Sequence, residues 1–344
     1  MLFLLVVMGI SAIVLIYPPL RLLNLLGAEN IPWWSPLALF ATPLALRSLH
    51  ERFNNGWTRR LTAIIMTWLG VCFISLCALV VAELVLLINF FTPQSVGACA
   101  GVFTLLVSLY SFVNAQRLHT QVVSITNQPT LRNVSLVQIS DVHVGSRQPG
   151  FLKPIVQRIN AINPTYTMIT GDLIDMRGIT TEHLACLGDI NSPTYFCIGN
   201  HERYVDLNDI CDRLRSLGIH VLRNECVEDG EFQFIGIDDA EIKSQVSHEI
   251  VKLKPAENLY KVLLYHRPDD AEAASAWGVN LMLTGHTHRG QIFPFNFLVK
   301  RVFPRLYKSY QVGAMQLYVS PGTGTWGPIM RLGSRCEITH FTFQ

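Results

Sequence analysis

The chain begins with long apolar runs and continues with short apolar runs separated by polar segments. The long runs lie near Leu2–Tyr17, Ile31–Leu46, Leu61–Val81 and Gly97–Ala115. A helix needs about 20 mostly apolar residues to cross the hydrocarbon core of a bilayer. The pattern therefore predicts about four transmembrane helices. The first two runs are short and flanked by prolines, so an arrangement with three crossings is the alternative.

Beyond Asn133 the apolar runs have the length of strands. The predicted strands are Val134–Ile139, Tyr166–Thr170, Thr194–Ile198, Glu231–Ile237, Tyr260–Tyr265, Leu281–Thr284, Met315–Val319 and Cys336–Phe343. Between them, Phe151–Asn160 and Leu207–Leu217 place apolar residues at intervals of three and four, as a helix covering a sheet does. This alternation predicts an α/β domain with a central layered sheet.

Charge divides the chain at the same place. The residues before Gln116 include no lysine, and their acidic and basic side chains are Arg21, Glu29, Arg47, Glu51, Arg52, Arg59, Arg60 and Glu83. We therefore expect a transmembrane helical region with a linker over residues 1–126 and a soluble domain over residues 127–344. The whole chain has 27 Lys and Arg against 25 Asp and Glu, so no nucleic-acid partner is expected.

Arginine also predicts the orientation in the membrane. The segment Arg47–Arg60 holds four arginines, so it is expected to be a cytoplasmic loop. Four crossings then place the soluble domain in the cytoplasm, and the protein is expected to be a multi-pass integral protein of the inner or plasma membrane. The eight cysteines show no CxxC spacing, which agrees with a reducing compartment. Glu83 is either an interfacial carboxylate at the end of the third run or an intramembrane functional group.

Five of the predicted strands run directly into side chains that can hold a metal. These side chains are Asp141 and His143, then Asp172, then Asn200 to Glu202, then His266, and finally His286 and His288. Ligand sites in open α/β sheets collect at the carboxyl ends of the strands. The five segments are therefore expected to converge, although about 150 positions separate the first from the last.

The spacing and the residue types narrow the chemistry. Residues two apart in an extended segment point the same way, so Asp141 and His143 could share one ion, and so could His286 and His288. Nitrogen and oxygen ligands without cysteine suit Mn, Fe or Zn better than Ca. A single Asp-x-His or Gly-Asp is ordinary turn chemistry. Five such segments in succession predict a metal centre.

The motifs DVH (141–143), GDLID (171–175), GNHE (199–202), YH (265–266) and GHTH (285–288) resemble those of the calcineurin-like metallophosphoesterases. The resemblance extends from about Asn133 to Gln344. The strings GHTHRGQIFPF (285–295) and GTWGPIMRLGSRCEIT (324–339) are similar to the membrane-associated branch of that family. The resemblance implies a four-layer α/β/β/α sandwich with a dinuclear site at one rim.

The resemblance also implies a role for each residue. One ion would be held by Asp141, His143, Asp172 and His288. The other would be held by Asp172, Asn200, His266 and His286, with Asp172 as the bridge. His201 would act on the scissile phosphate by stabilising charge or protonating the leaving oxygen, and Glu202 would orient it. Arg267, Arg289 and Arg331 are candidate phosphate contacts, with ion pairing or solvation as the alternative.

These expectations describe a metal-dependent phosphoesterase. Two divalent ions lower the pKa of a bound water, and the resulting metal-bound hydroxide would attack a phosphodiester or pyrophosphate bond. Because the domain is expected at a membrane among lipids, a lipid-linked phosphoester is the specific expectation for the substrate. Two alternatives stay open: a phosphodiesterase for soluble nucleotides that is merely tethered, and a non-catalytic metal-binding sensor or scaffold.

Overall fold

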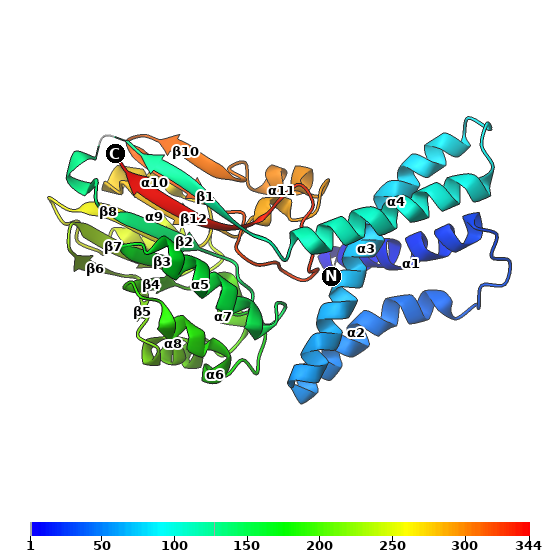
Figure 1. The fold of residues 1–344 in the computed structure, drawn as a ribbon, viewed down its shortest axis with the longest axis horizontal. Helices are drawn as coiled ribbons and strands as arrows, with labels where there is room; N and C mark the ends of the chain where they lie inside the picture. The colour runs from blue at the N-terminus through cyan, green and yellow to red at the C-terminus, as the bar shows by residue number, and fades with distance from the viewer. Residues whose placement is uncertain (1, 127) are drawn as a thin grey trace. The chain divides into compact units, whose positions relative to one another are not determined.

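The computed structural model describes residues 2–126 and 128–344, which form two compact units (Figure 1). One unit contains the residues up to Asn114 together with Gly327–Met330. The other contains Ala115–Trp326 and Arg331–Gln344. The first unit is helical, and the second holds all the strands that the described residues form.

The helical unit follows the four apolar runs. Its long helices are α1 (Leu2–Leu25), α2 (Ser35–Phe53), α3 (Gly56–Leu86) and α4 (Pro93–Asn114). By length and composition, α3 and α4 are each long and apolar enough to cross a bilayer. In α1, the described apolar stretch Gly9–Leu25 is shorter than that criterion. The number of crossings therefore stays a prediction.

The arginine-rich segment Arg47–Arg60 is mostly helical, which differs from the predicted loop. Helix α2 continues to Phe53, and α3 starts at Gly56. Asn54 adopts a left-handed conformation that ends α2, and the Asn55 side chain accepts hydrogen bonds from the first backbone N–H groups of α3. Asn54 and Asn55 thus form the whole connection, because Asn54 caps the end of α2 and Asn55 caps the start of α3.

Glu83 has a partner within the helical unit. Its carboxylate accepts two hydrogen bonds from Arg21 of α1, with Nε–Oε1 at 2.6 Å and Nη2–Oε2 at 3.0 Å. The Tyr17 hydroxyl donates a third, at 3.1 Å. Glu83 lies three residues before the end of α3 at Leu86. The ion pair therefore links α1 to α3 near the end of the third apolar run.

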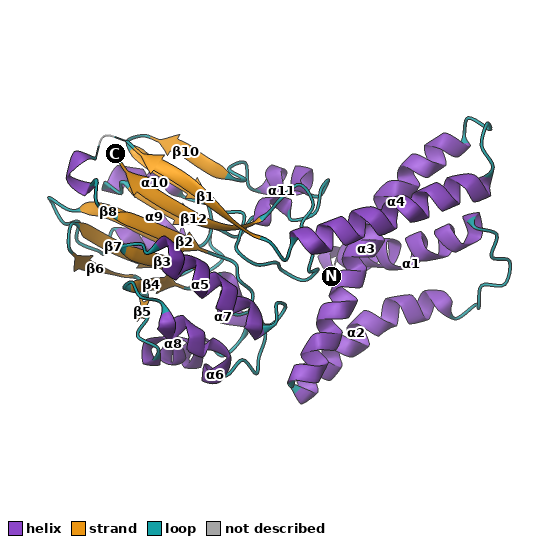
Figure 2. Ribbon diagram, viewed as in Figure 1, coloured by secondary structure: helices purple, strands orange, loops and turns teal. Residues whose placement is uncertain are grey.

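The second unit is built on two sheets (Figure 2). In the described chain, the first sheet has the order β1 (Leu118–Ile125), β12 (Cys336–Phe343), β2 (Ser135–Ile139), β3 (Tyr166–Thr170), β4 (Thr194–Cys197) and β5 (His220–Val221). The second has the order β10 (Lys308–Val312), β11 (Met315–Val319), β9 (Leu281–Thr284), β8 (Tyr260–Tyr265), β7 (Phe232–Ile237) and β6 (Glu225–Asp229). Strands β2 to β5 are parallel to one another, and so are β7, β8, β9 and β11.

Alternation of side chains along β2 shows how the layers form. Leu136 enters the apolar core between the sheets, whereas Val137 and Ile139 enter the core beneath the helices of the first sheet. Gln138 points into the space between the sheets, where its Nε2 donates to Thr284 O of β9 at 2.9 Å and to Thr170 Oγ1 of β3 at 2.8 Å. This buried amide therefore joins the two sheets at their carboxyl ends.

Helices cover the outer face of each sheet. Those that pack on the first sheet are α5 (Leu152–Ile162), α6 (Thr181–Leu184) and α8 (Leu207–Ser216). Those on the second are α9 (Gln245–Ile250) and α10 (Ala271–Trp277). The short elements are α7 (Asn200–Tyr204), α11 (Asn296–Val302), η1 (Pro129–Leu131), η2 (Pro149–Phe151), η3 (Ala185–Asp189) and η4 (His288–Gly290). The predicted α/β/β/α layering is confirmed.

The start of the second unit differs from the expected division between residues 126 and 127. Strand β1 lies in the segment assigned to the linker, and it pairs in parallel with β12 along its whole length, from Leu118 to Ile125. Its inward residue Ile125 is buried in the core between the sheets. The strand was missed because its outward residues are polar or exposed, and only its distant partner β12 shows that it is a strand.

Candidate metal centre

The predicted site residues lie at the carboxyl ends of five strands. Asp141 and His143 follow β2, and Asp172 follows β3. Asn200, His201 and Glu202 form the first turn of α7 after β4. His266 follows β8, and His286 and His288 follow β9. Since β2, β3 and β4 belong to one sheet and β8 and β9 to the other, the site straddles the rim of the sandwich.

Five of the predicted ligands have a left-handed backbone conformation. The φ angles are 52° at Asp141, 54° at His143, 50° at Asp172, 70° at His286 and 47° at His288. Such conformations cost about 1–3 kcal/mol each in a residue other than glycine and cluster at functional sites. Hydrogen bonds between the loops hold them, including Asp141 N to Gly171 O at 3.1 Å and His143 N to Asp172 O at 3.0 Å.

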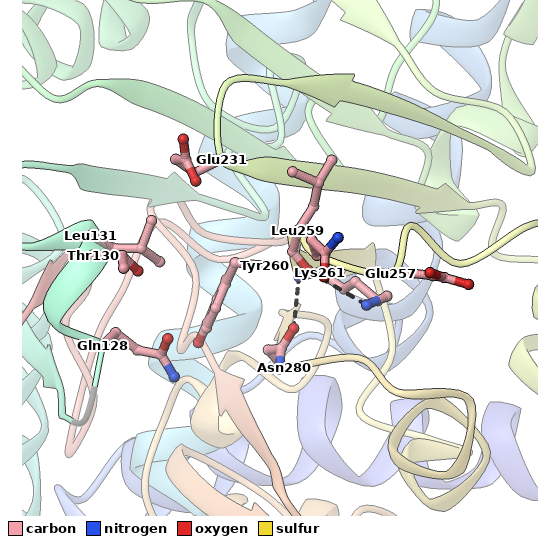
Figure 3. A pocket seen from close by; sticks show the side chains of 10 residues that line it. Gln128, Thr130, Leu131, Glu231, Glu257, Leu259, Tyr260, Lys261 and Asn280 are labelled. Atoms are coloured by element: carbon pink, nitrogen blue, oxygen red, sulfur yellow. Dashed lines mark hydrogen bonds between the residues drawn. The ribbon is translucent and has the colours of Figure 1, made fainter.

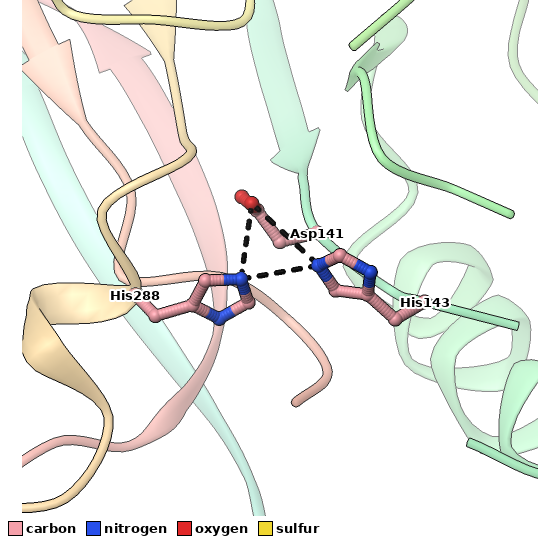
Figure 4. Close-up of side chains that lie close together, drawn as sticks. All are labelled: Asp141, His143 and His288. Carbon is pink, nitrogen blue, oxygen red and sulfur yellow. Dashed lines mark hydrogen bonds and ion pairs between the residues drawn. The ribbon is translucent and has the colours of Figure 1, made fainter. Parts of the chain in front are cut away.

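One group of potential ligands consists of Asp141, His143 and His288, whose side chains point toward one another in Figure 4. The two Nε2 atoms of His143 and His288 are 3.1 Å apart. Asp141 Oδ1 lies 3.4 Å from His288 Nε2 and 4.0 Å from His143 Nε2. All three residues are buried. One cation would fit among these three atoms.

A second group consists of Asp172, His266 and His286. His266 Nε2 lies 3.0 Å from Asp172 Oδ2 and 3.2 Å from His286 Nδ1. The two groups adjoin, because His143 Nε2 of the first lies 3.9 Å from Asp172 Oδ2 of the second. Asp141 Oδ1 likewise lies 3.9 Å from His266 Nε2. Each carboxylate therefore faces histidines of both groups.

The spacing argument for His286 and His288 fails in the structure. The two histidines fall into different groups, and the positive φ angles at both show that the segment is not extended as the argument assumed. His288 starts the short helix η4. The pairing of Asp141 with His143, by contrast, agrees with the first group.

The electrostatics of the site fit a bound cation. Burial lowers the pKa of His266, but the carboxylates of Asp172 and Asp141 outweigh burial and raise that pKa to about 10. Burial raises the pKa of Asp141, whereas His266 outweighs burial at Asp172 and holds its pKa well below the ordinary value. The Asp172 carboxylate thus favours a nearby positive charge, which a proton on His266 or a divalent cation supplies. Asn200 Oδ1 is buried without a hydrogen-bond partner in the structure, which is consistent with a metal ligand. The residues therefore fit divalent metal ions.

The protonation of the other histidines agrees with this interpretation. Burial holds the pKa of both His286 and His288 well below the ordinary value, so both imidazoles are neutral at pH 7 and can act as ligands. His266 Nδ1 lies 2.9 Å from Thr170 O. A proton on Nδ1 donates to that carbonyl, and Nε2 can act as a ligand where a cation replaces its proton.

Comparison with known proteins now decides the family. Residues 134–290 match the calcineurin-like phosphoesterase family. A metallophosphoesterase of Aquifex aeolicus is 31% identical over 253 residues, which cover 70% of this chain and 97% of the relative. The chain belongs to the calcineurin-like metallophosphoesterases.

Two further relatives extend the comparison. A metallophosphoesterase of Campylobacter jejuni is 31% identical over 248 residues, covering 69% of this chain and 66% of the relative. The transmembrane protein with metallophosphoesterase domain of Bos taurus is 35% identical over 240 residues, covering 63% of this chain and 54% of the relative. The aligned part therefore spans between about half and two thirds of these two proteins.

One acid of this metallophosphoesterase was overlooked in the sequence. Asp175 Oδ2 lies 3.3 Å from His143 Nδ1, on the side of the ring that faces away from the site. Ser146 fixes the carboxylate through its backbone N–H at 2.9 Å and its hydroxyl at 2.5 Å. Asp175 therefore orients His143. Its place at the end of the motif GDLID was the available signal.

His201 is held by aromatic contacts and by its backbone. The backbone N–H of His201 donates to Asp172 Oδ1 at 2.9 Å, and the ring Nε2 lies 3.9 Å from Asp172 Oδ2. The ring contacts His143 edge-on at 4.9 Å and Trp326 at 5.6 Å between centroids. Burial lowers the pKa of His201, although Asp172 opposes the shift. Sequence reasoning gave no role to Trp326, which lies 125 positions later in the chain, within the string GTWGPIMRLGSRCEIT (324–339).

Glu202 does not orient the His201 side chain in the structure. Its carboxylate accepts backbone hydrogen bonds from Asp172 at 3.0 Å, Ile174 at 3.0 Å and Gly199 at 2.8 Å. Burial and the nearby Asp172 raise the pKa of Glu202 to about 7. Glu202 is therefore a positioning residue that holds the loops after β3 and β4 together, and its expected action on the His201 side chain is corrected.

The three candidate arginines have other contacts. Arg267 forms ion pairs with Asp239 at 2.8 Å and Glu241 at 3.0 Å. The guanidinium of Arg289 lies 4.5 Å from the centre of the Tyr307 ring. Arg331 is fully buried, and it donates to the backbone carbonyls of His288, Gly322 and Gly324. Arg331 thus positions His288 through the backbone carbonyl of that residue.

A separate pocket of about 260 Å³ lies at the opposite ends of the strands (Figure 3). Its lining includes Tyr260 and Lys261 at the start of β8 and Asn280 just before β9. Asn280 Oδ1 accepts a hydrogen bond from the Lys261 N–H at 2.8 Å. Because the candidate metal ligands follow the other ends of these strands, this pocket is no part of the metal centre.

Proposed function

We propose that this chain is a membrane-anchored phosphoesterase with a dinuclear metal centre. The observation that carries the proposal is the shared position of Asp172 and Asp141 between the two ligand groups. Each acid lies within 4 Å of a histidine of the other group, at 3.9 Å in both cases. In phosphatases with two catalytic metal ions, the ions lie about 3.5–4 Å apart. Two adjoining groups suit that arrangement better than one isolated site.

We assign the ligands as the resemblance implied. Asp141, His143, Asp172 and His288 would hold one ion, and Asp172, Asn200, His266 and His286 the other. Bound Mn, Fe or Zn would supply Lewis-acid activation of water and of the phosphoryl oxygens. Asp175, Thr170 and Arg331 would keep His143, His266 and His288 in the orientations that ligation needs.

His201 is the residue that we assign to the phosphate itself. It is outside the two groups that contain Asp141 and Asp172, although it forms a third group of possible ligands with His143 and Asp175. Its Nε2 lies 3.9 Å from Asp172 Oδ2. Its partly exposed ring can donate a proton to a leaving oxygen, or a hydrogen bond to a phosphoryl oxygen that gains charge. Trp326 limits the positions that the ring can take.

The membrane location supports an amphiphilic substrate. Helices α3 and α4 are each long and apolar enough to span a bilayer, and the bovine relative is named a transmembrane protein. We propose a multi-pass protein of the inner or plasma membrane with the phosphoesterase unit in the cytoplasm. A diester or pyrophosphate bond next to a lipid would then be the natural target.

Full-length protein in lipid nanodiscs tests the proposal. The metal content is measured, ions are removed with a chelator, and Mn, Fe or Zn is restored singly. Hydrolysis is followed on a chromogenic phosphodiester, a phosphomonoester, a soluble nucleotide and a lipid-linked pyrophosphate. We expect chelation to abolish hydrolysis, restored metal to recover it, and the lipid-linked compound to turn over fastest. Activity that survives complete chelation contradicts the metal mechanism. Preference for the soluble nucleotide contradicts only the lipid assignment.

A further inference from the structure

The segment from Phe293 to Val302 exposes an unusual number of large apolar side chains. The exposed fractions are 50% for Phe293, 46% for Phe295, 61% for Phe297, 60% for Leu298 and 66% for Val302. We call these five residues the 293–302 face. Helix α11 contains no buried residue at all. Soluble proteins seldom expose contiguous apolar surface of this kind unless it binds something.

The charged side chains of the segment that contains the 293–302 face are all basic. The sequence from His286 to Lys308 contains five Lys and Arg residues and no acid. Lys300 and Arg301 occupy the last turn of α11 and are exposed. Arg305 is paired with Glu272, and Arg289 and Lys308 lie over the Tyr307 ring, so Lys300 and Arg301 are the basic side chains on the helix itself. A short helix with Phe and Leu beside Lys and Arg is typical of segments that lie in the headgroup region of an anionic bilayer.

The 293–302 face adjoins the metal centre. Phe303, the next residue, contacts the His286 ring at 5.0 Å between centroids. Trp326, which is 54% exposed, packs on His201. The Gln291 side chain fixes Trp326 beside this segment, because it accepts from Trp326 N at 2.9 Å and donates to Trp326 O at 3.0 Å. A surface that covered the 293–302 face would therefore lie next to two predicted site histidines.

We infer that the 293–302 face docks on an anionic lipid bilayer, with the aromatic and aliphatic side chains among the acyl chains and Lys300 and Arg301 at the headgroups. A second copy of this chain fits less well, because two such basic faces repel each other. Docking would bring the metal centre close to the headgroup layer. That consequence for the substrate rests on the proposed function, whereas docking itself does not require hydrolysis.

Hydrogen–deuterium exchange of full-length protein tests the docking directly. The backbone N–H groups of Leu298, Val299 and Phe303 bond only to nearby carbonyls, so exchange in α11 needs only local opening. Exchange is measured in nanodiscs of phosphatidylcholine alone and in nanodiscs with added phosphatidylglycerol. We expect slower exchange over residues 297–303 in the anionic discs. This difference should disappear at about 1 M salt, where the screening length is about 3 Å.

Two variants and a control separate docking from other causes of protection. Lys300→Gln with Arg301→Gln changes only exposed charges, and each basic residue contributes roughly a factor of five to binding an anionic surface. The double variant should therefore weaken docking about 25-fold and restore fast exchange. Phe297→Glu with Leu298→Glu should do the same. Val251→Glu, at a residue that is 70% exposed after α9, should change nothing.

The outcomes are distinguishable from those of the hydrolysis experiment. Metal content reports in each variant whether the centre is intact, and exchange reports docking whether or not any substrate is turned over. Equal exchange over residues 297–303 in both kinds of disc overturns the inference. Protection that persists in the Lys300→Gln, Arg301→Gln variant also overturns it, since the face would then be covered by protein and not by anionic lipid.

Discussion

The backbone N–H of His201 donates a 2.9 Å hydrogen bond to Oδ1 of Asp172. The other oxygen of Asp172, Oδ2, faces His266 at 3.0 Å. One carboxylate thus connects the start of α7 to a group of candidate ligands. The position of the proposed catalytic histidine and the integrity of the metal centre therefore depend on the same side chain.

Replacing Asp172 by Asn should reduce metal binding and hydrolysis together. The amide has one oxygen and no charge, so it cannot face both ligand groups and also accept from His201 N–H. We expect both quantities to fall by at least about 100-fold, the upper range for losing an outer partner of a metal ligand. Metal analysis beside hydrolysis of a chromogenic phosphodiester measures this. An unchanged rate would refute the bridging role.

Replacing His201 by Ala should preserve metal binding and reduce turnover. Loss of a general acid or of a charge-stabilising group typically slows the reaction about 10²–10⁴-fold. Because His201 belongs to neither of the two groups that we assign to the ions, metal content should stay at the level of the unchanged protein. His248→Ala, on the exposed side of α9, is the matched control. A His201→Ala protein that loses its metal would instead make His201 a ligand.

Replacing Glu202 by Gln should lower stability more than it alters chemistry. Three backbone N–H groups share the two carboxylate oxygens, and the glutamine amide would turn an NH₂ toward at least one of them. A buried donor left unsatisfied costs about 1–3 kcal/mol. Thermal unfolding compared with exposed Glu228→Gln measures the effect. A catalytic role would appear as lost turnover at an unchanged unfolding midpoint.

Replacing Glu83 by Gln should loosen the helical unit. The variant breaks the two-bond ion pair with Arg21. The Arg21 side chain is 30% exposed and the Glu83 side chain is 37% exposed. We expect a loss of about 1–3 kcal/mol, between the values for exposed and buried pairs. Thermal unfolding in detergent, with and without Arg21→Gln, gives the coupling. Equal effects of Glu83→Gln and of Glu51→Gln, from the exposed pair with Arg47, would contradict this role.

The sequence predicted much of the phosphoesterase unit because its signals are local. Eight apolar runs predicted strands. The strands β2, β3, β4, β8 and β9 are each followed at the carboxyl end by a polar motif with site residues. Parallel strands bring their carboxyl ends to one edge, so convergence of the motifs followed from topology. Strand β1 has no long apolar run, and only its pairing with β12, more than 200 positions away, shows that it is a strand.

The sequence by itself determined which residues could serve as ligands, because a short segment of sequence shows both the residue type and the end of a strand. Only the tertiary structure decided how these residues are grouped. His286 and His288 fall into different groups, and the buried Arg331 donates to backbone carbonyls. It also decided that Glu202 holds backbone and that Trp326 contacts His201. Such directions depend on contacts between loops far apart in the chain, which no local pattern contains.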